Sequence, residues 1–142
     1  MWKQRFKRSP NGFTLIETMV IVAIIGMLAG LGVPALSQYV QRQRVVGATN
    51  TLIADIQYAR SLAIARRATY RIDFGATQYQ IIENGPENVV KTATAPDGVT
   101  YAAGANPNFY PWGLSDPVNI VVGNPRKSSN VNLLPNGTVS HD

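Results

Sequence analysis

One carboxylate lies near the start of a long apolar stretch. Glu17 comes shortly after Gly12 and Phe13, and residues 19–36 carry no charged or strongly polar side chain. A lone carboxylate buried at membrane depth costs on the order of several kcal/mol unless it is paired or protonated. If the chain is cut between Gly12 and Phe13, the new α-amine of Phe13 lies one helical turn from Glu17. That amine, from the same chain or from a neighbouring copy, is a suitable partner for the carboxylate.

The apolar stretch is long enough to cross a bilayer. As an α-helix, residues 13–36 extend about 36 Å at about 1.5 Å per residue. The residues before it are basic, so the positive-inside tendency keeps residues 1–12 in the cytoplasm, and everything after Leu36 then faces the other side. An ordinary secretory signal peptide is the alternative, but this run is long for such an apolar core, and no clean Ala-x-Ala site follows it. The basic residues are Lys3, Arg5, Lys7 and Arg8.

The sequence Gly12-Phe13-Thr14-Leu15-Ile16-Glu17 resembles the class III signal of type IV pilins and type II secretion pseudopilins. This resemblance implies that a prepilin peptidase cleaves after Gly12 and methylates Phe13. It also implies that Glu17 helps to register incoming subunits against the amine of a neighbour, and that an inner-membrane assembly platform drives the process. Pro34 falls where these helices commonly carry a proline that bends or locally melts the helix.

Gly26 and Gly30 form a Gly-x-x-x-Gly pattern within the apolar stretch. This pattern lets helix backbones approach closely in lipid. Glycine is also frequent in membrane helices in general, so helix packing and background composition both remain open as explanations.

The basic character of the chain comes mostly from its first residues. The sequence has 13 Lys and Arg against 8 Asp and Glu, and four of the basic residues lie in residues 1–12. A processed chain is therefore nearly neutral, which gives little support for a general affinity for nucleic acid. There is no cysteine, so disulfides and thiolate sites are excluded.

The helix is expected to continue beyond the apolar stretch to about Arg67, with Gly47 as its only weak point. Apolar and small residues recur there at alternating spacings of four and three, which predicts one buried stripe. The stripe consists of Val45, Thr49, Leu52, Ile56, Ala59 and Ala63, while Arg42, Arg44, Arg60, Arg66 and Arg67 mostly lie off it.

The remaining residues are predicted to form a β-rich head that covers the stripe. Alternating patterns predict strands at residues 69–74, 78–83, 89–94, 99–101, 118–122 and 131–134. Asn84-Gly85-Pro86, Asp97-Gly98 and Asn136-Gly137 are turn signals. Residues 102–117 form a long loop with Phe109, Tyr110 and Trp112, for which packing against the sheet is favoured over exposure.

These elements predict an α+β fold with four segments. They are a cleaved basic leader at residues 1–12, a transmembrane and assembly helix at 13–36, an amphipathic half of the helix at 37–67, and a mainly antiparallel β head at 68–142. This arrangement corresponds to a pilin-like lollipop.

Residues 58–67, followed at once by a strand, are similar to the GspH/FimT group of minor pseudopilins and minor pilins. The resemblance implies a filament subunit of a type IV pilus or a type II secretion pseudopilus. The subunit would reside in the bacterial inner membrane as a single-pass protein with a periplasmic head, and would then pass into the filament with other pilin subunits. Arg60, Arg66 and Arg67 are interpreted as a solvated helix face rather than a basic patch.

Some FimT-like proteins bind DNA through a Gly-Arg-x-Arg motif near the C-terminus. The corresponding residues here are Gly137-Thr138-Val139-Ser140, so both arginines are missing. Arg126 and Lys127, expected in a loop at residues 124–130, are the remaining candidates for DNA contact. Two cations supply little of the electrostatic attraction to many phosphates on which DNA affinity depends. A purely structural subunit is therefore favoured, and a DNA-binding minor pilin is the alternative. A plain membrane-tethered periplasmic domain is a second alternative.

An enzymatic function is not indicated. Ser140, His141 and Asp142 are consecutive, and consecutive residues do not generally converge as a catalytic triad, so they are expected to form a mobile tail. The acidic residues of the head are scattered and suggest no metal cage, and there is no P-loop for a nucleotide. No cofactor is expected.

Overall fold

A computed structural model describes residues 12–85 and 87–142, with only the backbone described for residues 31–35. The chain divides into two units, Met1–Ser37 and Gln38–Asp142. The helix α1, Leu15–Arg66, contributes residues to both units. Each unit is described separately below.

The described part of the first unit consists of residues 12–14 and the beginning of α1. Large apolar side chains project from every face of this part of the helix, as in Met19, Val22 and Ile25, which are all exposed. Within residues 12–85 and 87–142, no helix has both the length and the apolar character that a membrane crossing requires.

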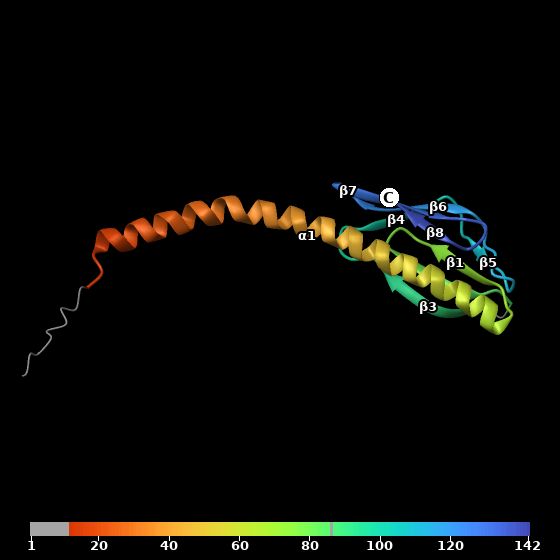
Figure 1. Cartoon of the computed structure of the whole chain (residues 1–142). Coiled ribbons are helices and arrows are strands. Elements are labelled where there is room, and N and C mark those ends of the chain that lie inside the picture. Colours follow the sequence, from red (N-terminus) through yellow and green to blue (C-terminus); the bar gives the residue numbers. More distant parts are fainter. Residues whose placement is uncertain (1–11, 86) are drawn as a thin grey trace, which may run out of the picture. The chain divides into compact units, whose positions relative to one another are not determined.

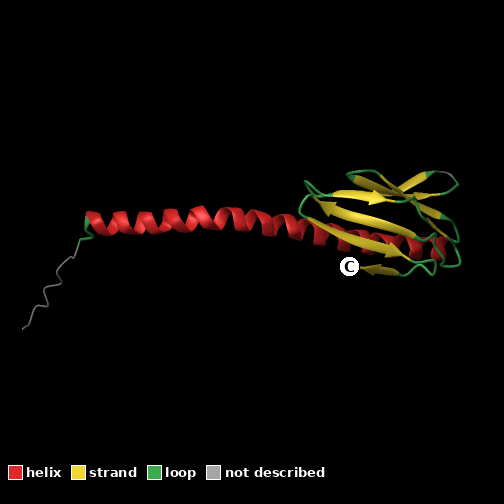
Figure 2. Cartoon of the chain, turned by 90° about the horizontal axis from the view of Figure 1, so that it is seen from above, coloured by secondary structure: helices red, strands yellow, loops and turns green. Residues whose placement is uncertain are grey.

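The second unit contains the rest of α1 and two antiparallel sheets (Figure 1). The first sheet has the strand order β3-β2-β1-β5 and the second has the order β4-β6-β7-β8. The strands of the first sheet are β1 (Tyr70–Phe74), β2 (Gln78–Glu83), β3 (Asn88–Thr94) and β5 (Asn108–Phe109). Those of the second are β4 (Thr100–Ala103), β6 (Val118–Asn124), β7 (Lys127–Leu133) and β8 (Val139–His141). Figure 2 shows the second half of α1 lying along the sheets.

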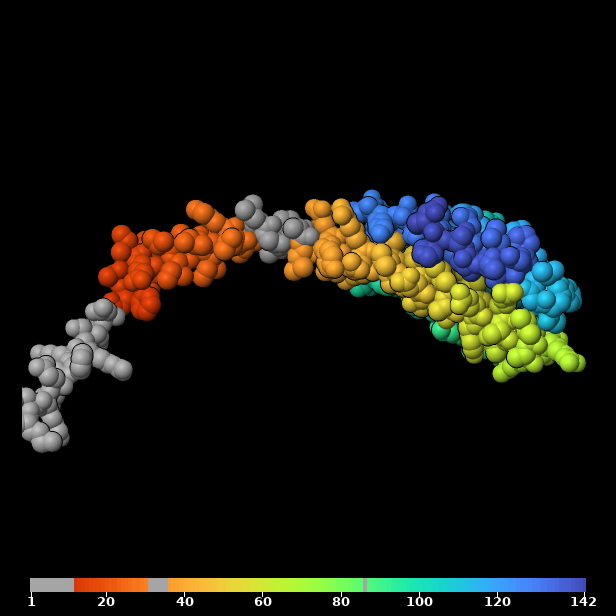
Figure 3. Space-filling view, in the orientation of Figure 1, coloured from red at the N-terminus to blue at the C-terminus, as the bar shows by residue number. Residues whose placement is uncertain are grey.

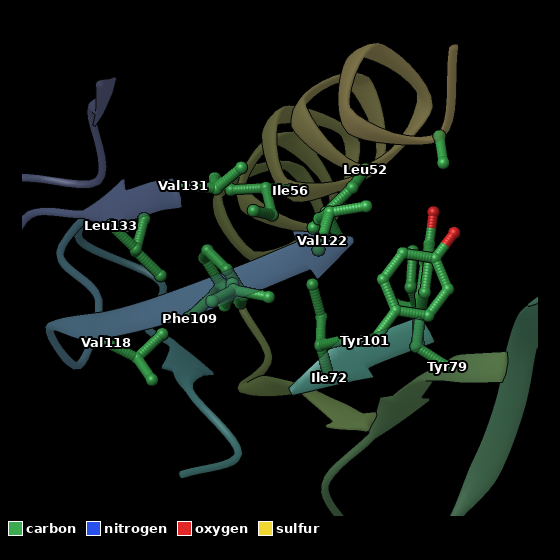
Figure 4. Packing of buried hydrophobic residues seen from close by; sticks show 14 of the residues in the cluster. Leu52, Ile56, Ile72, Tyr79, Tyr101, Phe109, Val118, Val122, Val131 and Leu133 are labelled. Carbon is green, nitrogen blue, oxygen red and sulfur yellow. The ribbon is translucent and has the colours of Figure 1, made fainter. Parts of the chain in front are cut away.

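The core forms where the buried stripe of α1 meets both sheets. Leu52 and Ile56 are fully buried, and Figure 4 shows them pointing toward Val122 and Val131 of the second sheet. All six residues predicted for the stripe are buried, and the helix passes through Gly47 without a break. The amphipathic pattern therefore identified the packed face of the helix correctly.

The helix ends as the sequence predicts, and the first hairpin follows at once. Arg67 adopts a left-handed conformation with φ 53° directly after the last residue of α1, and such a residue commonly terminates a helix. In β1, Tyr70 and Ile72 face the core while Arg71 and Asp73 lie on the opposite face. The predicted alternation of this strand is confirmed.

Three expectations for the head are wrong. Residues 124–130 are not a loop, because β7 begins at Lys127 and pairs with β6 in a tight hairpin with Asn124 opposite Lys127. The C-terminal residues are not a free tail, since β8 pairs with β7 and places His141 opposite Val131. The segment at residues 102–117 contains the short strand β5, which pairs with β1.

The aromatic residues of that segment are divided between core and surface. Phe109 is fully buried, as the favoured interpretation predicts. Tyr110 and Trp112 stack at a ring separation of 5.1 Å, and Trp112 remains 68% exposed. Packing against the sheet therefore holds for Phe109 and not for Trp112.

Candidate functional site

The junction at Gly12 and Phe13 lies just before the helix. Both residues are exposed, and α1 begins at Leu15. Thr14 caps the helix: its Oγ1 accepts a hydrogen bond from the Glu17 amide at 3.3 Å, and its carbonyl oxygen accepts one from the Thr18 amide at 3.3 Å. The peptide bond between Gly12 and Phe13 is consequently outside the hydrogen-bonded helix. The residues up to Asn11, which complete the predicted leader, lie outside the described residues.

Glu17 occupies the first turn of α1, where its negative charge interacts favourably with the positive end of the helix dipole. That interaction is worth about 0.3–1 kcal/mol, which is less than the cost of removing the carboxylate from water. Among the ion pairs formed by residues 12–85 and 87–142, none includes Glu17. A cation from outside this part of the chain would therefore be needed wherever the first turn is buried.

Gly26 and Gly30 face open space. A Cβ atom built on either residue meets nothing within 4 Å. Glycine in a helix interior destabilises the helix by about 0.5–1 kcal/mol relative to alanine, and no contact within the described residues offsets this loss. Pro34 falls within α1, so the helix continues through this position, while the bend predicted there remains a prediction.

The second half of α1 carries a buried carboxylate that the sequence interpretation missed. Asp55 is 4% exposed and lies between Leu52 and Ile56 on the packed face. Its Oδ2 accepts a hydrogen bond of 2.7 Å from the Tyr79 hydroxyl, and its Oδ1 accepts one of 2.5 Å from Lys91 Nζ. Burial, and then the hydrogen bond to Asp55, raise the pKa of Tyr79. The available signal was the position of Asp55, three residues after Leu52 on the apolar stripe.

Arg60 is not part of a solvated face, contrary to expectation. It is half-buried, and its Nε donates a hydrogen bond of 3.0 Å to the carbonyl oxygen of Gly113. Gly137 is packed against the same guanidinium, since a Cβ on Gly137 would lie 2.5 Å from Arg60 Nε. Arg60 therefore joins the loop before β6 to the turn before β8. Arg66 and Arg67 are exposed, as expected.

Arg126 and Lys127 lie at the β6–β7 turn. The Oδ1 of Asn124 accepts the amide hydrogens of both residues, at 2.9 Å and 2.8 Å, which fixes the turn. The Nδ2 of Asn124 donates to the carbonyl oxygen of Gln41 at 3.0 Å. The turn is thereby held against α1, with the side chain of Arg126 exposed. DNA contact by Arg126 and Lys127 stays a prediction.

The chemistry that the head can perform is limited by where its polar groups lie. Ser140 and His141 belong to β8, and the Asp142 amide donates to the carbonyl oxygen of Asn130, so the three C-terminal residues follow an extended strand. Successive residues of a strand point to opposite faces, which separates Ser140 from His141. In the part of the chain that the structure describes, no group of three His, Cys, Asp or Glu residues is placed to hold a metal ion.

Two family profiles match this chain. The profile described as Type II transport protein GspH covers residues 48–137, and the prokaryotic N-terminal methylation motif covers residues 7–33. The first match includes most of the packed half of α1 and nearly the whole head. The second includes Gly12, Phe13 and Glu17.

Curated relatives are fimbrial proteins. The chain is 35% identical over 98 residues to fimbrial protein EcpC of Eikenella corrodens, a match that covers 68% of this chain and 63% of that protein. It is 28% identical over 99 residues to a fimbrial protein of Pseudomonas aeruginosa, with 64% of each chain covered. The chain thus spans a little under two thirds of the length of these relatives.

Two solved structures share the fold. The type IV minor pilin FimU of Pseudomonas aeruginosa superposes with a TM-score of 0.62 at 15% identity, covering 73% of this chain and 92% of that one. The minor pseudopilin EpsH of the type 2 secretion system of Vibrio cholerae superposes with a TM-score of 0.59 at 10% identity, covering 69% and 95%. The predicted α+β fold and the resemblance to the GspH/FimT group are confirmed. The profile of the Type II transport protein GspH family matches more than half of the chain, from within α1 to the turn before β8. This protein therefore belongs to that family.

Proposed function

We propose that this protein is a structural subunit of a type IV pilus or of a type II secretion pseudopilus. In this proposal a prepilin peptidase cleaves it between Gly12 and Phe13 and methylates Phe13. Before assembly the subunit resides in the inner membrane with its head in the periplasm. An assembly platform then moves it into the filament. Its partners are other pilin or pseudopilin subunits.

The contrast between the two halves of α1 is the observation that carries the proposal. Along the second half, the apolar stripe is buried against the head, as for Leu52. Along the described residues of the first half, the apolar side chains are exposed, as for Leu15 at 78% and Met27 at 71%. A helix that is apolar all round is normally buried in a membrane or a core. The charge-free sequence of residues 19–36 supports lipid first and a bundle of like helices afterwards.

The position of Glu17 explains how such helices can be aligned. Cleavage at Gly12 leaves Phe13 as the residue before the cap Thr14, so the new α-amine stands at the end of the helix that also carries Glu17. In a bundle of like helices, the amine of one subunit can neutralise the carboxylate of its neighbour. A displacement along the filament axis would leave both charges unpaired in an apolar environment, and this cost favours a single register.

The test is the chemical nature of the amino terminus. Mass spectrometry of the protein extracted from membranes should find a chain that begins with methylated Phe13. Gly12→Leu should block the processing and keep the leader, whereas Gly47→Ala, in the packed half of the helix, should leave it unchanged. An unaltered protein that begins at Met1 would instead identify a permanently tethered domain, and one that begins after a later residue would identify a secretory signal peptide.

The same fold occurs in minor subunits of both apparatuses, as FimU and EpsH show by their similar TM-scores. Deletion of the gene provides the discriminating experiment. Loss of surface pili with normal protein secretion assigns the subunit to the pilus, and the reverse result assigns it to the secretion pseudopilus.

A further inference from the structure

Basic side chains from two distant parts of the sequence gather at one end of the head. The hydrogen bond from Asn124 to the Gln41 carbonyl holds the β6–β7 turn against α1 where the helix begins to pack on the sheets. Figure 3 shows the blue atoms of this region beside the orange atoms of the helix. We call this surface the basic end. It comprises Arg42 and Arg44 of α1 with Arg126 and Lys127 of the turn.

The basic end extends around both sides of the helix. On one side, Gln41, Arg44 and Arg126 line the same cleft. On the other side, Val46 and Lys127 line a second cleft. Arg42 precedes Val46 by one helical turn and so lies on the same face of α1. The four cations are therefore distributed around the helix rather than along one edge.

Little negative charge compensates these cations. Asp97 lines the first cleft, but Arg44 Nη1 donates to its carbonyl oxygen, at 3.0 Å, and the Asp97 carboxylate is in no ion pair among the described residues. Asp142 lines the second cleft with Lys127. Within residues 12–85 and 87–142, no ion pair includes a residue of the basic end. The surface thus keeps an excess of positive charge.

The sequence fixes how far the basic end can be from the apolar segment. Arg42 follows Leu36 by six positions, which a fully extended chain spans in about 20 Å, and a helix in about 9 Å. The headgroup layer of a bilayer occupies about 5–8 Å on each side of its hydrocarbon core. If Leu36 is at the edge of the hydrocarbon, the helical spacing of α1 therefore places Arg42 just above the headgroups and within a Debye length of their charge.

We propose that the basic end binds anionic phospholipid headgroups and holds the head on the membrane surface until the subunit enters the filament. This inference rests on the membrane location in the proposed function and adds a specific ligand to it. Basic side chains near an anionic membrane surface attract it within about a Debye length. A lipid surface fits these observations better than DNA, because the cations surround the part of the helix that follows the apolar segment most closely in the chain.

The experiment uses the full-length protein as it is isolated from membranes, placed in lipid nanodiscs. Discs of phosphatidylcholine alone are compared with discs that also contain phosphatidylglycerol, and hydrogen exchange is measured for amides of the β6–β7 turn and of residues 97–100. Exchange should be slower in the anionic discs, and the difference should disappear at high salt. Arg42→Gln combined with Arg126→Gln removes two exposed cations, and each removal should weaken docking about fivefold.

Arg66→Gln combined with Arg67→Gln is the matched control. It removes the same charge from exposed positions at the other end of the packed helix, so it should leave the lipid-dependent protection unchanged. Equal exchange in both kinds of disc, or an equal loss of protection in the control variant, overturns the proposal. So does duplex DNA binding that falls in Arg42→Gln with Arg126→Gln when phosphatidylglycerol has no effect, because the surface would then serve nucleic acid.

Mass spectrometry of the same preparation separates this inference from the proposed function. A methylated Phe13 without any lipid effect means that lipid docking alone fails. An amino terminus at Met1 together with lipid-dependent protection means that the filament assignment fails, while the lipid contact stands for a tethered head.

Discussion

The Asp55 carboxylate accepts a hydrogen bond of 2.7 Å from the Tyr79 hydroxyl and thereby connects α1 to β2 inside the core. The Tyr79 ring also packs edge-to-face against Tyr101, with ring centroids 5.1 Å apart. Lys91 of β3 reaches the second oxygen of the same carboxylate from the surface. One side chain of the helix therefore holds two neighbouring strands of the first sheet in place.

Asp55→Ala is expected to lower the free energy of unfolding by about 2–4 kcal/mol, because it leaves the Tyr79 hydroxyl without its partner in a buried position. Asp73→Ala is the control. Its carboxylate pairs with Arg71 at the surface of β1, where such pairs are worth about 0–1 kcal/mol. Urea denaturation of both variants measures the difference, and similar losses would show that the buried pair has no special importance.

Stability should decrease at alkaline pH, in part through Tyr79. Burial and the hydrogen bond to Asp55 raise its pKa in the folded protein, whereas an unfolded tyrosine ionises near pH 10. The unfolded state therefore loses its proton first, so the stabilisation is complete below about pH 10 and is lost as the pH rises further. Melting temperatures across this range should depend less on pH in Tyr79→Phe than in the unaltered protein. Tyr58→Phe, at an exposed position, should not flatten the curve.

Gly137 and Gly98 provide a matched pair of glycines with positive φ, at 75° and 79°. Gly98→Ala should cost about 1–2 kcal/mol for the left-handed backbone alone, since its Cβ would face open space. Gly137→Ala should cost more, about 3–4 kcal/mol, because its Cβ would lie 2.8 Å from the Gly113 carbonyl oxygen and also against Arg60. Thermal denaturation compares the two, and equal losses would contradict the close packing at Gly137.

Glu17→Ala is expected to be processed normally and to enter filaments poorly, because the neighbouring amine loses its counter-charge. Thr18→Ala is the adjacent control, since the Thr18 hydroxyl donates to the Leu15 carbonyl oxygen of its own helix, at 2.7 Å. The readout is the ratio of subunit in sheared filaments to subunit in membranes, with the amino terminus checked by mass spectrometry. Normal incorporation of Glu17→Ala would remove the function proposed for the carboxylate.

Gly30→Leu should leave the melting temperature of the head unchanged, because a Cβ at this position meets nothing within 4 Å among the described residues. If Gly26 and Gly30 permit close approach of helices in the filament, the added side chain should reduce incorporation. Met27→Leu conserves volume on the same segment and should be tolerated. Unimpaired assembly of Gly30→Leu would favour background composition as the reason for these glycines.

The periodic elements were predictable from the sequence, because each is specified by its own residues. The stripe that includes Leu52 and Ile56 determined which face of α1 is buried, and the alternation in β1 determined which of its residues face the core. The N-terminal methylation motif was equally predictable, since its profile matches residues 7–33, while cleavage between Gly12 and Phe13 stays a prediction. In the head, the turn at Gly137 was indicated by its Asn-Gly pair.

Other features depend on partners that are distant in the chain. The strand β8 has little apolar pattern of its own and forms because β7 offers a free edge. The sequence analysis therefore predicted a tail at these residues. Lys127 begins a strand because Asn124 fixes the turn before it. Asp55 and Arg60 were assigned no interaction, because Tyr79, Lys91 and Gly113 reach them only in the folded head.

The sequence by itself determined the apolar first half of the helix, the packed face of its second half and the motif that relates the chain to its family. Each of these is a periodicity or a short motif, which neighbouring residues specify without reference to the rest of the chain. The tertiary structure alone decided the pairing of the two sheets, the buried contacts of Asp55 and Arg60, and the convergence of Arg42 and Arg126 at one end of the head. Those arrangements arise from contacts between residues far apart in sequence, whose formation depends on the free energy of the whole packed core.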